Sequence, residues 1–175
     1  DTEAVYRQFV YENYQTVDQG LEKTIAHLFD QDEFENTGIY SISQHIRDTL
    51  TKYMKYDEKT NTQSENVLED FLNQKISGND VLFASAAVEA FLHYNIPARY
   101  VEGYLLKSDA IDEEGNATLT SKDGHAWVEV YFDGMGWLPI DVTPGYYYDV
   151  YTLMNMVATP QGDNSQVNIE KGHKD

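Results

Sequence analysis

The chain has 175 residues, of which 12 are basic and 30 acidic, giving a formal net charge of -18. A surface this acidic repels phosphate backbones and anionic lipids, which disfavours nucleic acid and membrane surfaces as partners. The absence of Cys excludes disulfides, thiolate metal sites and thiol catalysis. No apolar run approaches the roughly 18 residues of a membrane span, so we expect membrane attachment only through segments outside this chain.

Apolar residues recur at helical spacing in the first part of the chain, which predicts a helical lead-in over residues 1–66. Ser43 is the expected N-cap of its last long helix. Residues 57–65 are polar and predict a loop. The triplet Ser77-Gly78-Asn79 is expected to break the chain before the next helix. The helices predicted before residue 80 span residues 2–14, 21–29, 43–55 and 67–72.

Residues 80–94 form the strongest helical segment, with small and apolar side chains on almost every face. A helix with so little polar surface is expected to be central and buried. After Pro97 the hydrophobic period changes to that of strands. Helices followed by antiparallel strands are typical of the α+β class. The predicted strands span residues 98–106, 125–132 and 137–142, the last two joined by a turn at 133–136.

The length favours a single domain, which we place at residues 1–159, with its core at 67–159 and a polar tail at 160–175. The chain begins at Asp1 rather than Met. We therefore expect a processed chain or an excised domain of a larger protein.

A His and an Asp stand at the ends of two neighbouring predicted strands. His125 opens the first strand, and Asp141 closes the second. This arrangement places a general base beside the carboxylate that orients it, as nucleophilic catalysis requires. The nucleophile that such a pair should serve is a Cys, and the chain has none.

Four motifs follow one another between about residues 70 and 146. They are Gly78-Asn79-Asp80-Val81-Leu82-Phe83-Ala84, Asn95-Ile96-Pro97-Ala98-Arg99, Gly124-His125-Ala126-Trp127 and Asp141-Val142-Thr143-Pro144. These runs resemble Gly-x-Cys-x-x-Phe-Ala, Gly-Ile-Pro-Ala-Arg, His-Ala-Trp and Asp-x-Thr-Pro of the transglutaminase-like superfamily, a branch of the papain-like cysteine peptidase fold. The resemblance implies an α+β, papain-like architecture, with N-terminal helices and a central helix packed on an antiparallel sheet.

The resemblance also implies roles for three residues. In the family a Cys begins the central helix, a His on the first strand is the base, and an Asp on the next strand fixes its tautomer. By position the base is His125 and the orienting acid is Asp141. The nucleophile position falls on Asp80, because the Phe83-Ala84 pair follows it as it follows the family's Cys. A carboxylate is a poor nucleophile toward amides and cannot form a thioester.

Several interpretations of Asp80 are open. As a structural replacement, it would cap the helix and form an ion pair with His125 that closes the old site. Alternatively, Asp80, His125 and Asp141 could surround a divalent cation, although Asp141 should orient the ring rather than bind metal. Ser77 and Ser85 lie nearby, but neither aligns with the nucleophile. An engineered replacement of a native Cys is a further alternative.

Other polar and aromatic residues have two interpretations each. Arg99, Glu102 and Tyr104 follow the central helix, and we expect an ion pair and an ordinary strand face, with a lining of the cleft as the alternative. Trp127 and Trp137 are expected to be core aromatics flanking the hairpin.

We therefore predict a domain that lacks its nucleophile and is inactive in acyl transfer and peptide hydrolysis. It would serve as a binding or structural module of a larger extracytoplasmic or membrane-anchored bacterial protein, and its cleft would take polypeptide or cell-wall peptide, without metal or cofactor. The alternative is an active hydrolase or acyltransferase that uses Asp80, His125 and Asp141, with or without a divalent metal.

Overall fold

A computed structural model of the protein describes residues 2–29, 37–61, 65–74, 76–105 and 111–146. The tail predicted at 160–175 and the domain limit at 159 lie outside these residues. In chain order the elements are α1 (Thr2–Asn13), α2 (Glu22–Leu28), α3 (Ile39–Tyr53), β1 (Lys55–Tyr56), α4 (Val67–Gln74), β2 (Ser77–Gly78), α5 (Asp80–His93), β3 (Ala98–Tyr104), the 3-10 helix η3 (Ser121–Asp123), β4 (Gly124–Phe132) and β5 (Gly136–Ile140).

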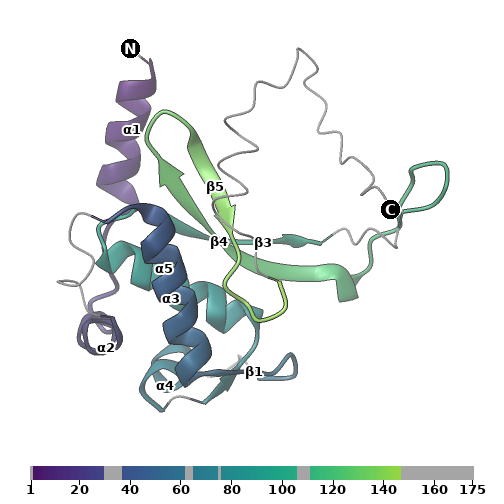
Figure 1. The fold of residues 1–175 in the computed structure, drawn as a ribbon, viewed down its shortest axis with the longest axis horizontal. Coiled ribbons are helices and arrows are strands. Elements are labelled where there is room, and N and C mark those ends of the chain that lie inside the picture. Colours follow the sequence, from purple (N-terminus) through teal and green to yellow (C-terminus); the bar gives the residue numbers. More distant parts are fainter. Residues whose placement is uncertain (1, 30–36, 62–64, 75, 106–110, 147–175) are drawn as a thin grey trace.

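Helix α5 lies at the centre of the fold, as its apolar sequence predicts. It contacts α2, α3 and α4 as well as strands β3 and β4. The side chains of Phe83, Ala87 and Phe91 are fully buried in this core. Figure 1 shows α3 and α5 side by side, with the sheet next to them. The predicted α+β architecture, a central helix packed on an antiparallel sheet, is confirmed.

The main sheet has the strand order β3-β4-β5, and both pairings are antiparallel. Strand β4 is in the middle, with Gly103 opposite His125 on one side and Ile140 opposite Val128 on the other. Because side chains alternate along a strand, Val128 and Val130 enter the core while His125 belongs to the opposite set. The register therefore fixes where His125 lies relative to both neighbouring strands.

Helix α3 begins earlier than predicted. Gly38 is its N-cap, and Ser43, expected in that role, lies inside the helix. The Ser43 hydroxyl donates a hydrogen bond of 2.8 Å to the carbonyl of Ile39, one turn back. This local bond lets Ser43 remain in a helix interior, while the buried Ile42 extends the apolar face toward the N-terminus.

The predicted breaker before α5 is in fact a short strand. Ser77 and Gly78 form β2, which pairs in parallel with β1. Helix α5 begins immediately afterwards, with Asn79 as its N-cap accepting a hydrogen bond of 3.2 Å from the backbone N–H of Leu82. The β1–β2 pair thus fixes the point at which the central helix begins.

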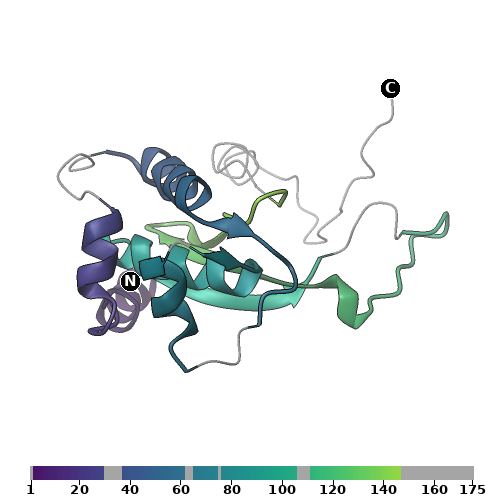
Figure 2. The ribbon, with the colours of Figure 1, turned by 90° about the horizontal axis from the view of Figure 1, so that it is seen from below.

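Helix α1 packs against the β4–β5 hairpin (Figure 1), and its Val10 is fully buried. Tyr11 donates a hydrogen bond of 3.1 Å to Asp133, and the Trp137 indole N–H donates one of 3.0 Å to the Tyr6 hydroxyl. Trp137 and Trp127 are half-buried, so the prediction that both are core residues is wrong. Figure 2, turned by 90°, shows the helices at one end and the loop after residue 111 at the other.

Gly78 offers a test of the packing that positions α5. A Cβ atom at this residue would lie 2.5 Å from Cε2 of the fully buried Phe71 and 3.1 Å from Cβ of Leu82. We expect Gly78→Ala to lower the free energy of unfolding by about 1–3 kcal/mol, because an overpacked core must shift. Gly38→Ala is the matched control, since no atom lies within 4 Å of its added Cβ. Equal urea midpoints for the two variants would contradict this packing.

Candidate functional site

The structure brings the three predicted site residues together from three elements. Asp80 is the first residue of α5, His125 is the second residue of β4, and Asp141 directly follows β5. His125 Nδ1 lies 3.0 Å from Asp80 Oδ2, and His125 Nε2 lies 2.5 Å from Asp141 Oδ2. The imidazole therefore bridges two carboxylates, one on each ring nitrogen, and Asp141 holds the far nitrogen as expected.

The backbone holds Asp80 in this position. Asp80 Oδ2 accepts a hydrogen bond of 2.8 Å from the backbone N–H of Ala126, besides its contact with His125. The carboxylate also stands at the N-terminal end of α5, where the helix dipole favours negative charge. Its side chain is 20% exposed, so it is the member of the three that reaches solvent.

Asp141 lies at the buried end of the chain of hydrogen bonds. It is 2% exposed, and His125 is 7% exposed. Its second oxygen, Oδ1, accepts a hydrogen bond of 3.0 Å from the backbone N–H of Thr143. Both carboxylate oxygens thus have partners, which a buried charge requires. The turn that follows β5 supplies this second partner.

Two aromatic rings cover the imidazole of His125. The Tyr146 ring stacks on it with ring centroids 4.4 Å apart. The Trp127 ring lies nearly parallel to the imidazole, with ring centroids 6.4 Å apart. The Trp127 ring occupies the space above Gly103, where an added Cβ would meet its Cη2 at 2.6 Å. Sequence analysis missed Tyr146 in this role and placed Trp127 in the core. The only available signal for Trp127 is its position two residues after His125 on a strand, which places both side chains on one face.

The electrostatic environment favours a charged imidazole. Burial acts to lower the pKa of His125, but its hydrogen bonds to Asp141 and Asp80 outweigh burial and raise that pKa to about 9. Burial acts to raise the pKa of Asp80, but its hydrogen bonds from His125 and the Ala126 N–H lower it overall. At neutral pH the site therefore holds an imidazolium between carboxylates, with a net charge of about -1 from these groups.

This arrangement limits the chemistry of the site. A protonated His125 has no free lone pair, so it cannot remove a proton from a nucleophile at neutral pH. The two carboxylates lie at different ring nitrogens and do not converge on one point. Within the described residues, no group of three or more His, Asp or Glu side chains is arranged to hold a metal ion.

A cleft of about 480 Å³ opens beside Asp80. Tyr104 and Glu102 line it from β3, and Asp80 lines it from the helix. Glu102 and Tyr104 therefore line the cleft, which was the alternative interpretation of these two residues. Arg99 forms the expected ion pair, with its Nη2 2.6 Å from Oε2 of Glu129. The full lining comprises Asp80, Val81, Glu102, Gly103, Tyr104, Ser121, Gly124, His125 and Ala126.

Neither nearby serine takes the place of the missing nucleophile. Ser77 belongs to β2, before the helix begins. The Ser85 hydroxyl lies more than a turn into α5 and donates a hydrogen bond of 2.7 Å to the carbonyl of Val81. Neither residue belongs to the cleft lining.

Comparison with known proteins defines the class to which this fold and site belong. The family model of the transglutaminase-like superfamily matches residues 30–142. The chain therefore belongs to the transglutaminase-like superfamily, and the predicted resemblance is confirmed.

Two curated relatives are similar to part of this chain. The uncharacterized protein YebA of Bacillus subtilis (strain 168) is 36% identical over 87 residues, which is 47% of this chain and 12% of that protein. A protein-glutamine gamma-glutamyltransferase of Pseudomonas aeruginosa is 36% identical over 77 residues, which is 43% of this chain and 11% of that protein. The matched segments thus span only 12% and 11% of the lengths of these relatives.

Two solved structures share the fold. The periplasmic domain of TgpA from Pseudomonas aeruginosa, bound to ethylmercury, has a TM-score of 0.54 at 23% identity, covering 78% of this chain and 49% of that one. A putative cysteine protease from Cytophaga hutchinsonii has a TM-score of 0.51 at 22% identity, covering 75% and 41%. Among the described residues, none of the helices has the length and hydrophobicity that crossing a bilayer requires.

The bridged imidazole predicts a pH dependence of stability. The folded pKa of His125, about 9, lies above the ~6.5 of an unfolded His, so its stabilising effect is complete below about pH 6.5. We expect this contribution to disappear as the pH rises through about 9, and that of Asp80 to disappear as the pH falls through its lowered pKa. Urea unfolding across pH, with an NMR titration of His125, measures both effects.

Two histidine variants test whether His125 causes the loss of stability at alkaline pH. His125→Gln should remove the loss of stability on the alkaline side, whereas His27→Gln, at an exposed residue of α2, should retain it. An NMR titration that places the pKa of His125 at or below 6.5 would contradict the bridged arrangement.

Proposed function

We propose that this chain is a transglutaminase-like domain that no longer performs acyl transfer and uses its cleft to bind polypeptide. The supporting observation is the position of Asp80. It stands at the start of the central helix, where the family resemblance places a Cys, and it is held by His125 and the Ala126 N–H. A carboxylate at this position cannot carry an acyl group as a thioester, and the chain contains no Cys.

We also propose that the domain works outside the cytoplasm, as part of a larger protein. A periplasmic domain shares its fold, and the curated relatives are far longer than the segment they share with it. The formal charge of -18 supports a soluble surface that avoids nucleic acid and anionic membranes.

The second candidate is a hydrolase that uses Asp80, His125 and Asp141. The observation in its favour is the unbroken chain of hydrogen bonds through His125, with Asp80 open to the cleft. This candidate predicts turnover of peptide or ester substrates that His125→Ala abolishes. Absence of turnover in the unaltered protein, with the fold intact, would favour the binding module.

Restoring the thiol tests whether the site retains the geometry of a catalytic one. We expect Asp80→Cys to have a thiol pKa below the ~8.5 of a free Cys, because it would stand at a helix N-terminus beside His125. The rate of iodoacetamide alkylation as a function of pH measures this value.

Ser121→Cys is the matched control, because Ser121 lines the same cleft but lies on η3 rather than at the start of α5. Its thiol should titrate near ~8.5. Identical profiles for the two variants would mean that the region around Asp80 no longer resembles a catalytic site.

Binding itself is tested by NMR titration of the unaltered protein with a broad panel of short peptides and cell-wall peptide fragments. We expect saturable chemical-shift changes at cleft residues such as Gly124 and Ala126, without turnover. If no member of the panel changes these signals, the domain is structural and the proposed binding function is wrong.

A further inference from the structure

We propose that the cleft recognises the cationic side chain of a Lys or Arg in an extended polypeptide, through Glu102 and Tyr104 of strand β3. The inference rests on the proposed function, since it names the class of polypeptide that the cleft binds. It depends on a carboxylate that forms no ion pair among the described residues and on an exposed aromatic ring beside it, both at the edge of a cavity.

The two residues lie on one face of the edge strand of the main sheet as described. Tyr100, Glu102 and Tyr104 are alternate residues of β3, so their side chains project to the same side. Glu102 and Tyr104 both line the cleft of about 480 Å³ that Asp80 also lines. Among the described strands, β3 pairs only with β4, so its other edge offers an extended polypeptide a strand to follow.

In the part of the chain that the structure describes, Glu102 is a carboxylate without a counter-ion. Within the described residues it forms no ion pair, whereas Glu129, on β4, is bound by Arg99 at 2.6 Å. The hydroxyl of Tyr100 donates a hydrogen bond of 2.5 Å to Glu102 Oε1, which fixes the carboxylate in place. One oxygen of a positioned anion is therefore left to accept a hydrogen bond from a cation.

Tyr104 provides the aromatic half of the site. It is 60% exposed, and within the described residues its ring makes no aromatic contact, unlike the rings of Tyr146 and Trp127 around His125. An open ring two residues from an unpaired carboxylate on the same strand face suits an ammonium or guanidinium group, which an aromatic face and an anion attract together.

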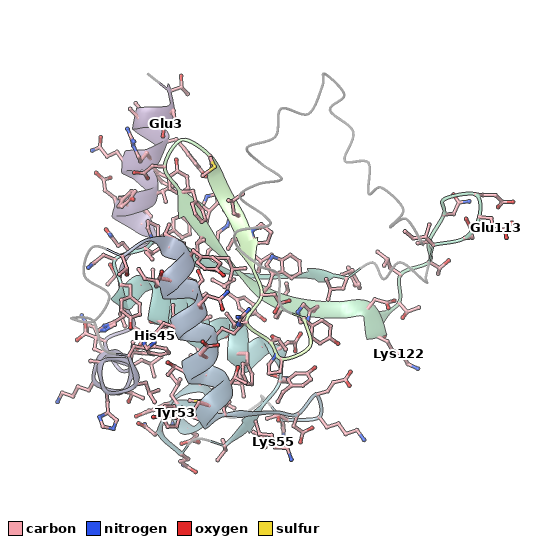
Figure 3. The ribbon with its side chains drawn as sticks, in the orientation of Figure 1. Glu3, His45, Tyr53, Lys55, Glu113 and Lys122 are labelled. Atoms are coloured by element: carbon pink, nitrogen blue, oxygen red, sulfur yellow. The ribbon has the colours of Figure 1, made fainter. Side chains whose placement is uncertain are left out.

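The remaining charges of the cleft favour the same ligand. No Lys or Arg is among the described residues that line it, and the positive charge of His125 is shared between Asp80 and Asp141. Counting these three groups with Glu102, the cleft has a net charge of about -2 at neutral pH. Lys122 lies on η3, just before β4 begins, and its side chain points away from α5 (Figure 3).

A side chain fits this site better than a bare metal ion. Calcium and magnesium require several converging oxygen ligands, and no such group is present in the described part of the chain. Lys and Arg carry a long apolar stem that can lie along Val81 and the Tyr104 ring while the charged end reaches Glu102.

The test compares three peptides that differ at one residue. The probes are acetyl-Ala-Ala-Lys-Ala-Ala-amide and the same peptide with norleucine or Glu at the centre, titrated by NMR at low salt. We expect the Lys peptide to bind at least about tenfold more tightly than the norleucine peptide, the difference of a charge-assisted hydrogen bond. Added salt should weaken its binding, because the Coulombic part is screened.

Matched variants locate the recognition. Glu102→Gln should weaken binding of the Lys peptide about tenfold and leave norleucine binding unchanged. Glu113→Gln makes the same charge change in the exposed loop, which Figure 3 shows beyond Lys122. Glu113 is not one of the cleft-lining residues, so this variant should have no effect. Tyr104→Leu should weaken Lys binding severalfold while keeping the apolar surface.

Each result decides between defined alternatives. Peptides that bind with no preference for Lys, or variants Glu102→Gln and Glu113→Gln that weaken binding equally, overturn the cationic specificity and leave the binding function standing. If none of the three peptides, nor the broad panel, binds, both proposals fail together.

Discussion

The interaction on which the site depends is the double hydrogen bond of one imidazole to two carboxylates. His125 at the edge of β4 requires a partner on each ring nitrogen because it is almost completely buried. Asp141 satisfies one nitrogen from the end of β5 and Asp80 satisfies the other from the start of α5. The three charged groups can be buried only together, because both carboxylates stabilise the same imidazolium and the imidazolium in turn stabilises both of them.

The fold surrounding this interaction has the form of a catalytic scaffold. The β1–β2 pair fixes the first residue of α5, the sheet register fixes His125, and the turn after β5 holds Asp141 through Thr143. A Cys at the start of α5 would exchange a proton with the His125 ring, which could accept it from the thiol and return it later. Asp80 has no thiol proton to give, and its carboxylate acts together with Asp141 to keep the proton on the ring.

Sequence analysis could predict the architecture because it follows from local order, and it selected Asp80, His125 and Asp141 through the motifs of the family resemblance. The apolar run of α5 and the alternation of β3 to β5 are strong periodic signals, and the motifs around Asp80, His125 and Asp141 lie close to the ends of these elements. The start of α3, the two-residue strand at Ser77 and the stacking of Tyr146 on His125 were not predictable, because each depends on contacts between segments far apart in the chain.

The site residues come from the two halves of the chain. Asp80 belongs to the helical half, and His125 and Asp141 belong to the hairpin that follows the loop after residue 111. Neither half can satisfy the imidazole by itself, so the protonation state of a single histidine reports whether the halves have docked. The contact of Asp80 with His125 thereby joins the helices to the sheet, and the loop between the two halves is a natural place at which to divide the chain into two complementing fragments.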